Sequence, residues 1–356
     1  MALMLILRKR RAALSQSERV VVIGGAGFIG SRLTLALANA GCHVVVVSRS
    51  SGGRRSSNPC IEYHSGRVAD RDRMSQLIAG ASVVYDLSMA GGATWEDWKR
   101  EVIDAAVSVA EICLDRGVRR LIYTSTTAAL YLGKRGTVSE ADLGNEAGRR
   151  DRSDYCQSKS LVENKLLELH RTRHLPVVIF RPAVVMGVGG PMVHAALGDR
   201  VSDICVVGFG KGKTPLPCVL VDDVAEALLL AKDAPDIDGL TFNLAGDVRP
   251  SASEFVSMLR ERTRRNFRFY PRSMWRIGAA EYSRYLVKKL TRKPGNQSVR
   301  FRDFRSSALV TQLDCSLAKQ KLGWRPVSDR DEFLRRALDV FIKPIPPGDV
   351  RLEVAE

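Results

Sequence analysis

Tyr155 and Lys159 lie four residues apart, and apolar residues follow them at helical spacing, at Val162 and Leu166. We therefore expect a helix that presents both side chains on one face. A free tyrosine titrates near pH ~10, but a nearby ammonium favours the phenolate and so permits general acid–base chemistry. Considered alone, the pair is also compatible with an exposed aromatic beside a surface lysine, because this spacing is common by chance.

A second candidate site follows a β-branched run at residues 20–23, where three glycines are spaced three apart. The first permits a tight turn, the second lets the backbone approach a pyrophosphate, and the third lets a helix pack close to the strand. The helix N-terminus favours the phosphate charge. The turn is also compatible with a plain strand-to-helix connection. The candidate dinucleotide contacts here are Gly24, Gly27, Phe28, Ile29 and Gly30.

The elements that must position these residues alternate along the first half of the chain. We expect strands at 20–23, 44–47, 61–63, 83–87 and 121–125, and helices at 28–40, 72–78 and 98–115. Such alternation implies right-handed crossovers and a parallel sheet, whose active groups lie at the carboxyl ends of the strands. The fold class is therefore α/β, a Rossmann-type doubly wound parallel sheet.

Beyond Gly187 the alternation gives way to shorter elements rich in glycine and proline. We expect a dinucleotide-binding domain at 18–187, with 217–246 returning to it and with Val219–Val221 and Thr241–Leu244 joining the main sheet. A smaller C-terminal substrate-binding lobe comprises 188–216 and 247–343, with helices at 253–262, 317–322 and 332–341. Residues 1–17 and 344–356 are tails.

Composition bounds the class of protein. The chain has 356 residues, 45% of them hydrophobic, and no apolar run approaches the ~20 residues of a membrane span. The N-terminal apolar segment precedes its basic cluster, which is the wrong order for a secretory signal. The seven cysteines are scattered without metal-ligand spacing, so we expect reduced thiols, no metal site and a cytoplasmic protein, with a peripheral membrane position left open.

The net charge of +16 is concentrated late in the chain. Residues 260–305 contain 15 Lys and Arg against three acidic residues, an excess of +12. We expect no nucleic-acid partner, because the fold signals do not support one; anionic substrates or a membrane surface explain a local basic patch. On a helix at 274–290, one side would carry an aromatic and basic surface suited to anionic lipid. The alternative is a lobe helix whose aromatics pack inward. The residues of that side are Trp275, Tyr282, Tyr285, Leu286 and Lys289.

Ser48 and Arg49 follow the second strand, where an acidic residue typically holds the ribose 2′-hydroxyl of NAD. A neutral residue beside an arginine accommodates a 2′-phosphate instead. The pair predicts NADP, with NAD still possible, and the alternative interpretation is an exposed polar loop.

These motifs together resemble the extended short-chain dehydrogenase/reductase family, the NAD(P)-dependent sugar epimerase/dehydratase group. The resemblance runs from Arg19 to Phe341. It rests on the glycine turn, the hydroxyl-rich end of the fifth strand and the Tyr-Lys pair. Four further motifs also match, at 180–187, 220–225, 242–246 and 322–326.

The resemblance implies a role for each site residue. Tyr155 is similar to the residue that transfers the proton, and Lys159 to the group that binds the nicotinamide ribose and lowers the tyrosine pKa. Thr127 resembles the hydroxyl that orients the substrate oxygen, a task that Ser125 and Thr126 are close enough to share. Pro182 and Val184 resemble residues that line the nicotinamide, and a homodimer is expected.

Some positions depart from the family pattern. Ile23 replaces a threonine, Arg67 stands where an acidic residue often contacts adenine, and Asp86 and Ser88 replace a common histidine and alanine. Thr127 is followed by two alanines, whereas sugar 4,6-dehydratases of the family carry an Asp-Glu pair there to eliminate water. None of these changes removes the Tyr-Lys pair.

The sequence therefore predicts an NAD(P)-dependent enzyme acting on a secondary hydroxyl or keto group of a small-molecule substrate. A nucleotide sugar is the first expectation, with epimerisation or reduction as the reaction. A hydroxysteroid or other lipid alcohol is the alternative substrate. A non-catalytic NADP-binding protein is the alternative of another class, and retention of both Tyr155 and Lys159 argues against it.

Overall fold

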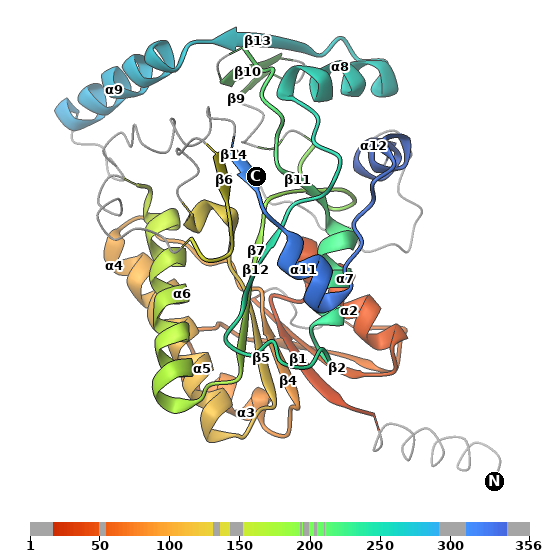
Figure 1. Ribbon diagram of the computed structural model, residues 1–356. Coiled ribbons are helices and arrows are strands. Elements are labelled where there is room, and N and C mark those ends of the chain that lie inside the picture. Colours follow the sequence, from red (N-terminus) through yellow and green to blue (C-terminus); the bar gives the residue numbers. More distant parts are fainter. Residues whose placement is uncertain are drawn as a thin grey trace.

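The structure is a computed structural model (Figure 1) that describes residues 17–49, 55–130, 136–142, 152–192, 194, 199–202, 205–209, 211–291 and 311–339. The expected C-terminal tail and all but Ser17 of the expected N-terminal tail lie outside the described residues.

A seven-stranded sheet forms the centre of the molecule, and every neighbouring pair of its strands is parallel. The chain builds one half outward from β1, then crosses back to place β4 beside β1, so the strand order reverses between these two strands. This arrangement confirms the expected α/β fold class. In spatial order the strands are β12 (Thr241–Leu244), β7 (Val177–Pro182), β5 (Arg120–Thr124), β4 (Val83–Asp86), β1 (Arg19–Ile23), β2 (His43–Ser48) and β3 (Ile61–Ser65).

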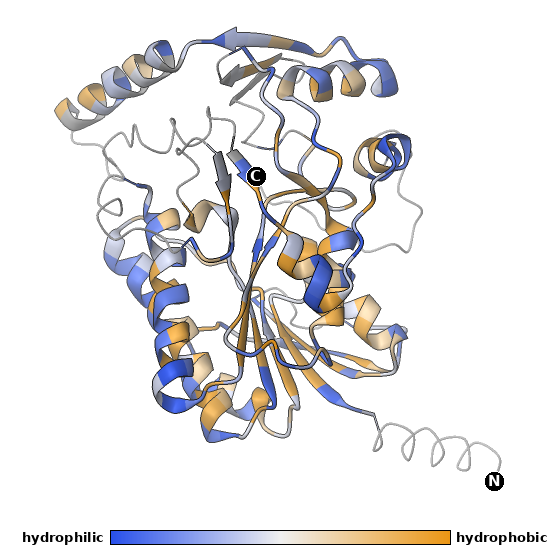
Figure 2. Cartoon of the chain, viewed as in Figure 1, coloured by the Kyte–Doolittle hydropathy of each residue, from blue (hydrophilic) through white to orange (hydrophobic). Residues whose placement is uncertain are grey.

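Helices cover both faces of this sheet, which explains the continuous β-branched runs of its central strands. In β1, Val20 and Val22 enter the core on one face, whereas Val21 and Ile23 enter the core on the other. Figure 2 shows the resulting apolar sheet between two helical layers. The first layer holds α2 (Phe28–Asn39), α7 (Val221–Leu230) and α11 (Ser316–Leu322), and the second holds α3 (Arg71–Ile78), α5 (Ala105–Asp115) and α6 (Asp154–Arg173).

The helix expected at 98–115 is interrupted. It begins as α4 (Trp95–Trp98), where Thr94 and Asp97 form a capping box, continues as a π-helical segment at Lys99–Asp104, and becomes regular only in α5. Such π-helical segments are rare, and apolar residues at Val102, Ala106 and Val109 still fit a helical spacing, so the pattern did not reveal the interruption.

The strand expected at Val219–Val221 does not join the main sheet. It forms β11 (Cys218–Leu220), which pairs in parallel with β8 (Val184–Met186) in a separate two-stranded sheet. Thr241–Leu244 does join the main sheet, as β12 beside β7. Another two-stranded sheet was not expected from the sequence. In it, β6 (Gly136–Val138) pairs in parallel with β14 (Thr311–Leu313).

A smaller lobe lies beyond the carboxyl ends of the strands (Figure 1). Its three-stranded sheet has the order β13–β10–β9, and a third apolar core joins residues of α8 and α12 to β10 and β11. Among the described residues, no helix is long and apolar enough to cross a membrane. The lobe elements are β9 (Asp199–Ser202), β10 (Cys205–Phe209), α8 (Ala252–Thr263), β13 (Arg268–Arg272), α9 (Met274–Leu290) and α12 (Arg330–Leu338).

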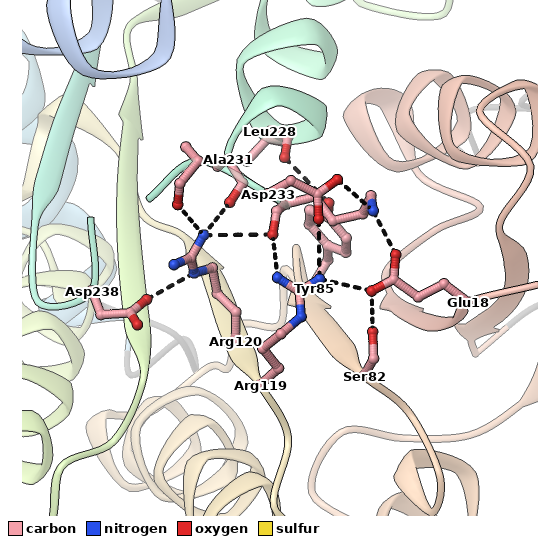
Figure 3. A network of polar contacts seen from close by, with 11 residues as sticks. Glu18, Ser82, Tyr85, Arg119, Arg120, Leu228, Ala231, Asp233 and Asp238 are labelled. Atoms are coloured by element: carbon pink, nitrogen blue, oxygen red, sulfur yellow. Dashed lines mark hydrogen bonds and ion pairs between the residues drawn. The ribbon is translucent and has the colours of Figure 1, made fainter. Parts of the chain in front are cut away.

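At the amino ends of the strands, a network of charges ties β1, β5 and the end of α7 together (Figure 3). Arg119 bonds Glu18 at 2.7 Å and Asp233 at 3.2 Å, and Lys232 bonds the same two carboxylates. Arg120 pairs with Asp238 at 2.7 Å. Partial burial pushes the pKa of Glu18 upward, but its bonds to Lys232, Ser82 and Arg119 outweigh burial and lower that pKa to about 2.

We expect Glu18→Gln to reduce the free energy of unfolding at pH 7 by about 1 kcal/mol, because the network is partly exposed and screened by solvent. The pKa of Glu18 is lowered on folding from 4.5 to about 2. Its stabilisation is therefore complete above pH 4.5 and disappears as the pH falls toward 2. Urea unfolding of both proteins across this range measures the difference. Glu168→Gln, at an exposed position of α6, is the control; an equal loss there, or a loss independent of pH, would contradict the assignment.

Candidate active site

A cavity of about 1230 Å³ opens at the carboxyl ends of the strands, next to the point where the strand order reverses. Every site residue expected from the sequence lines it, although these residues come from five separate stretches of the chain. The expected residues in its wall are Gly24, Gly27, Phe28, Ile29, Gly30, Ser48, Arg49, Ser125, Thr127, Tyr155, Lys159, Pro182 and Val184.

The glycine turn between β1 and α2 leaves no room for side chains. Gly24 has a φ of +81°, and a Cβ there would lie 2.7 Å from the carbonyl oxygen of Leu87. A Cβ on Gly30 would lie 2.2 Å from the carbonyl oxygen of Gly24. The three-glycine spacing therefore reflects direct contact between the turn, the helix and the loop after β4.

The N-terminus of α2 faces the cavity with the properties of an anion site. Gly27 is the N-cap and supplies no side-chain acceptor, and the first turn contains no acidic residue. The amide groups of Phe28 and Ile29 and the positive end of the helix dipole are thus left for a ligand. These residues fit the pyrophosphate of a dinucleotide, and Ser48 and Arg49 line the cavity at the end of β2, where its adenosine ribose would lie. Arg67, near the expected adenine end, pairs with Glu101 at 3.0 Å.

Tyr155 is half-buried in the first turn of α6, which Ser153 caps by accepting from the amide of Cys156. Burial raises the pKa of Tyr155, and a hydrogen bond with the Thr126 side chain opposes that shift. Thr126 is thus the hydroxyl that contacts the tyrosine. The role that the resemblance gave first to Thr127, orienting the substrate oxygen, stays a prediction. The ring of Trp98 packs edge-on against that of Tyr155, with 6.1 Å between the centroids.

Lys159 is buried one turn further along α6. Its ammonium donates to the Tyr123 hydroxyl at 3.0 Å and to the carbonyl of Thr124 at 3.1 Å. Burial lowers the pKa of Lys159, whereas the negative charges of Asp86 and Glu163 raise it. Since an ammonium has three protons, one remains to bind a ligand in the cavity.

Two buried hydroxyls at the end of β5 have no hydrogen-bond partner among the described residues. They belong to Thr124 and Ser125, and both residues line the cavity. Buried polar groups normally find partners, so unsatisfied hydroxyls in a cavity wall indicate that a ligand supplies them. Ser125 therefore stands ready to bind an oxygen beside Tyr155.

Asp86 is a functional candidate that the sequence presented only as a departure from the family pattern. It pairs with Tyr123 across β4 and β5, it is fully buried, and one of its carboxylate oxygens has no partner among the described residues. Burial raises the pKa of Asp86, and bonds from Ser88 together with the charge of Lys159 oppose the shift. The signal available in the sequence was a carboxylate within the apolar run 83–87. Only the fold reveals that Lys159 is near.

The arrangement suits proton transfer coupled to redox chemistry on a bound ligand. A phenol, a free hydroxyl and a buried ammonium converge on one end of the cavity, and the glycine cradle forms another part of its wall. No group of three His, Cys, Asp or Glu side chains that could hold a metal occurs in the described part of the chain.

Comparison with known proteins agrees with this geometry. A family model described as "NAD dependent epimerase/dehydratase family" matches residues 20–245. The chain is 28% identical over 275 residues to a UDP-glucose 4-epimerase of Streptomyces lividans, covering 69% of this chain and 82% of that protein. It is 24% identical over 221 residues to a 2-alkyl-3-oxoalkanoate reductase of Stenotrophomonas maltophilia, covering 61% of this chain and 66% of that protein.

Several curated relatives are longer than the matched part, which spans between 58% and 66% of their length. Among solved structures, MoeE5 in complex with UDP-glucose and NAD superposes with a TM-score of 0.69 at 23% identity, over 91% of this chain and 98% of that one. This likeness shows that the two chains share a fold.

We expect Asp86→Asn to move the alkaline limb of the pH profile of kcat/KM to lower pH, by about one unit. The change keeps the shape of the side chain but removes the charge that raises the pKa of Lys159, so the ammonium is lost earlier on titration. Cys113 of α5 and Tyr123 of β5 also face Asp86, and burial keeps both neutral over this range. The measurement is turnover against pH.

Asp70→Asn is the matched control, because Asp70 is an exposed N-cap that asparagine replaces well. An unshifted profile in a folded Asp86→Asn protein would mean that Asp86 is already neutral in the wild type and would contradict its electrostatic role.

Proposed function

The chain belongs to the NAD dependent epimerase/dehydratase family, and on that premise we propose that it is an NADP-preferring enzyme of secondary alcohols. Its substrate is a nucleotide-linked sugar, and its reaction is epimerisation or reduction of a keto-sugar. The observation that carries this proposal is the convergence of Tyr155, Ser125 and Lys159 on a cavity that also holds the glycine cradle.

In the proposed reaction Tyr155 removes the proton of the substrate hydroxyl, or returns it in the opposite direction. NADP, when bound, supplies the hydride acceptor. Ser125 binds the reacting oxygen, and Lys159 holds the ribose next to the tyrosine. Burial keeps Tyr155 protonated in the free enzyme, so it begins as an acid. Its work as a base requires a lower pKa, which the Thr126 hydrogen bond and any positive charge brought beside the ring both favour.

The dimensions of the cavity support a bulky second ligand. Its volume of about 1230 Å³ exceeds the ~300–1,000 Å³ usual for a single small molecule. Basic side chains in its wall suit phosphate groups. They include Arg152 and Arg100, the latter paired with Asp97 and Glu101 of the same wall. Arg152 is buried and also donates to the carbonyls of Ala128 and Ala129, which holds the turn after β5 in place.

A lipid alcohol remains the second candidate substrate. Apolar residues form part of the same wall, at Met89, Leu216 and Pro217, and the side chain of Met89 is 73% exposed. The Stenotrophomonas relative, named as a 2-alkyl-3-oxoalkanoate reductase, supports this second candidate.

Dehydration is not part of the proposed function. Ala128 and Ala129 occupy the turn beside Thr127 and contribute no carboxyl group to eliminate water.

We also propose a cytoplasmic homodimer. The family resemblance supports the dimer, and the free cysteines of the described residues suit a reducing compartment.

The first test incubates the protein with NADP or NAD and a panel of UDP-linked hexoses and lipid alcohols, and follows both NAD(P)H absorbance and product stereochemistry. Tyr155→Phe should lower turnover by about 10²–10⁴-fold while cofactor binding is kept, because only the proton carrier is removed. Tyr270→Phe, at an exposed tyrosine of β13, is the control. Retention of more than about a tenth of the wild-type rate would refute the role of Tyr155, and a product lacking one water would refute the reaction type.

The second test concerns the cofactor. We expect NADP to bind at least about tenfold more tightly than NAD, a difference of about 1.4 kcal/mol, and Ser48→Asp with Arg49→Ala to reverse the order. Direct titration of each dinucleotide decides it. Arg55→Ala, an exposed arginine outside the cavity wall, should change nothing. Equal affinities in the wild type would mean that Arg49 is a solvated loop charge.

A further inference from the structure

Helix α9 presents large apolar side chains to solvent along one side. Trp275 is 85% exposed, Tyr282 48%, Leu286 41% and Leu290 83%. Successive members are seven, four and four residues apart, so all four project from the same side of the helix. Figure 1 places α9 at the outer end of the lobe, away from the central sheet.

This exposure answers the question that the sequence left open. The alternative in which the aromatics pack inward is wrong for Trp275 and Tyr282, and holds in part for Tyr285, which is half-buried. Gly278, three residues after Trp275 on the same side of the helix, is buried. A contiguous apolar stripe on a solvent-exposed surface typically marks a site of interaction.

The same region carries the charge excess of the chain. The described residues 260–291 contain ten Lys and Arg against two acidic residues, an excess of +8. Exposed basic residues next to the start of the stripe are Arg272 of β13 and Arg276 of α9. An apolar stripe flanked by cations matches a surface that is apolar within and anionic at its boundary.

We propose that this part of the lobe is a docking surface for an anionic lipid bilayer. The α9 surface comprises Trp275, Tyr282, Leu286 and Leu290, with Arg272 and Arg276 at its edge. Tryptophan and tyrosine favour the depth of the headgroups, the leucines reach the acyl boundary, and the arginines neutralise lipid phosphates.

Two other occupants fit less well. A second copy bound across a two-fold axis would bring two segments of +8 charge, residues 260–291 of each copy, together, which opposes association. A nucleic acid would satisfy the arginines but leave Trp275 and Leu290 in water. A bilayer satisfies both kinds of side chain.

The mode of contact is peripheral. The 17 residues of α9 extend about 26 Å as a helix, and the arginines within it keep it at the interface. The strand before it, β13, pairs with β10 of the lobe, so docking would hold the lobe at the membrane. The proposal does not depend on the reaction, because binding is measured without turnover.

The test is co-sedimentation of the full chain with vesicles of phosphatidylglycerol or of phosphatidylcholine alone. We expect binding to the first and little to the second. Trp275→Ser combined with Leu286→Ser should lower the affinity about tenfold through lost apolar burial. Arg272→Glu combined with Arg276→Glu should also lower the affinity. About 0.5 M salt should weaken binding of the wild type, because it screens the attraction between the arginines and the lipid phosphates.

The controls match each change. Leu35→Ser alters an apolar residue of α2 that is 39% exposed, close to the value for Leu286, and Arg173→Glu alters an exposed arginine at the end of α6. Both should bind like the wild type, and thermal unfolding checks that every variant is folded. Sedimentation velocity without lipid measures self-association.

Three results would overturn the proposal. The first is an absence of binding to phosphatidylglycerol at low salt. The second is binding that the folded α9 variants retain in full or that the controls lose equally. The third is a wild-type oligomer that the apolar α9 variant converts to monomers without lipid, which would make a second copy the partner.

Discussion

A lysine ammonium is buried at the carboxyl end of the central sheet, and the surrounding structure depends on how that charge is satisfied. Removing an ammonium from water is costly unless protein groups replace the lost hydration. Here the replacements are the Tyr123 hydroxyl and the Thr124 carbonyl, with the charges of Asp86 and Glu163 acting on Lys159 from β4 and from α6 itself. One charge thus holds two strands and a helix in a fixed relation, and the same helix carries Tyr155.

The second carboxylate of this group extends the constraint to β7. Glu163 lies four residues after Lys159, and Arg181 of β7 pairs with it at 2.7 Å, both side chains being buried. Arg181 also donates to the carbonyls of Glu140 and Asp142, which anchors the chain after β6. Two buried cations therefore face two buried carboxylates. Loss of any one member would leave a charge without compensation, which costs more than the pair contributes.

Features that short-range sterics determine were the ones predictable from sequence. The turn at Gly24–Gly30 and the parallel sheet follow from residue types and spacing over a few positions. The contact of Thr126 with Tyr155, the charge of Asp86 beside Lys159, and the separate pairing of Cys218–Leu220 depend on segments distant in sequence. Several adjacent hydroxyls satisfy the local pattern equally well, so only tertiary packing determines which of them contacts Tyr155. In the same way, the sequence of an apolar strand does not specify which sheet the strand joins.

The residues at the two ends of the cavity are supported by different apolar cores. The geometry of the reaction centre therefore does not determine which substrate the cavity accepts. Tyr155 and Lys159 stand on α6, whose apolar face packs in the core beneath the main sheet. Leu216, in the opposite wall, belongs to the lobe core together with Phe255 and Phe333. Repacking of the lobe core therefore reshapes the ligand wall without moving the proton carrier. The geometry of the proton carrier is therefore compatible with different substrates at the other end of the cavity.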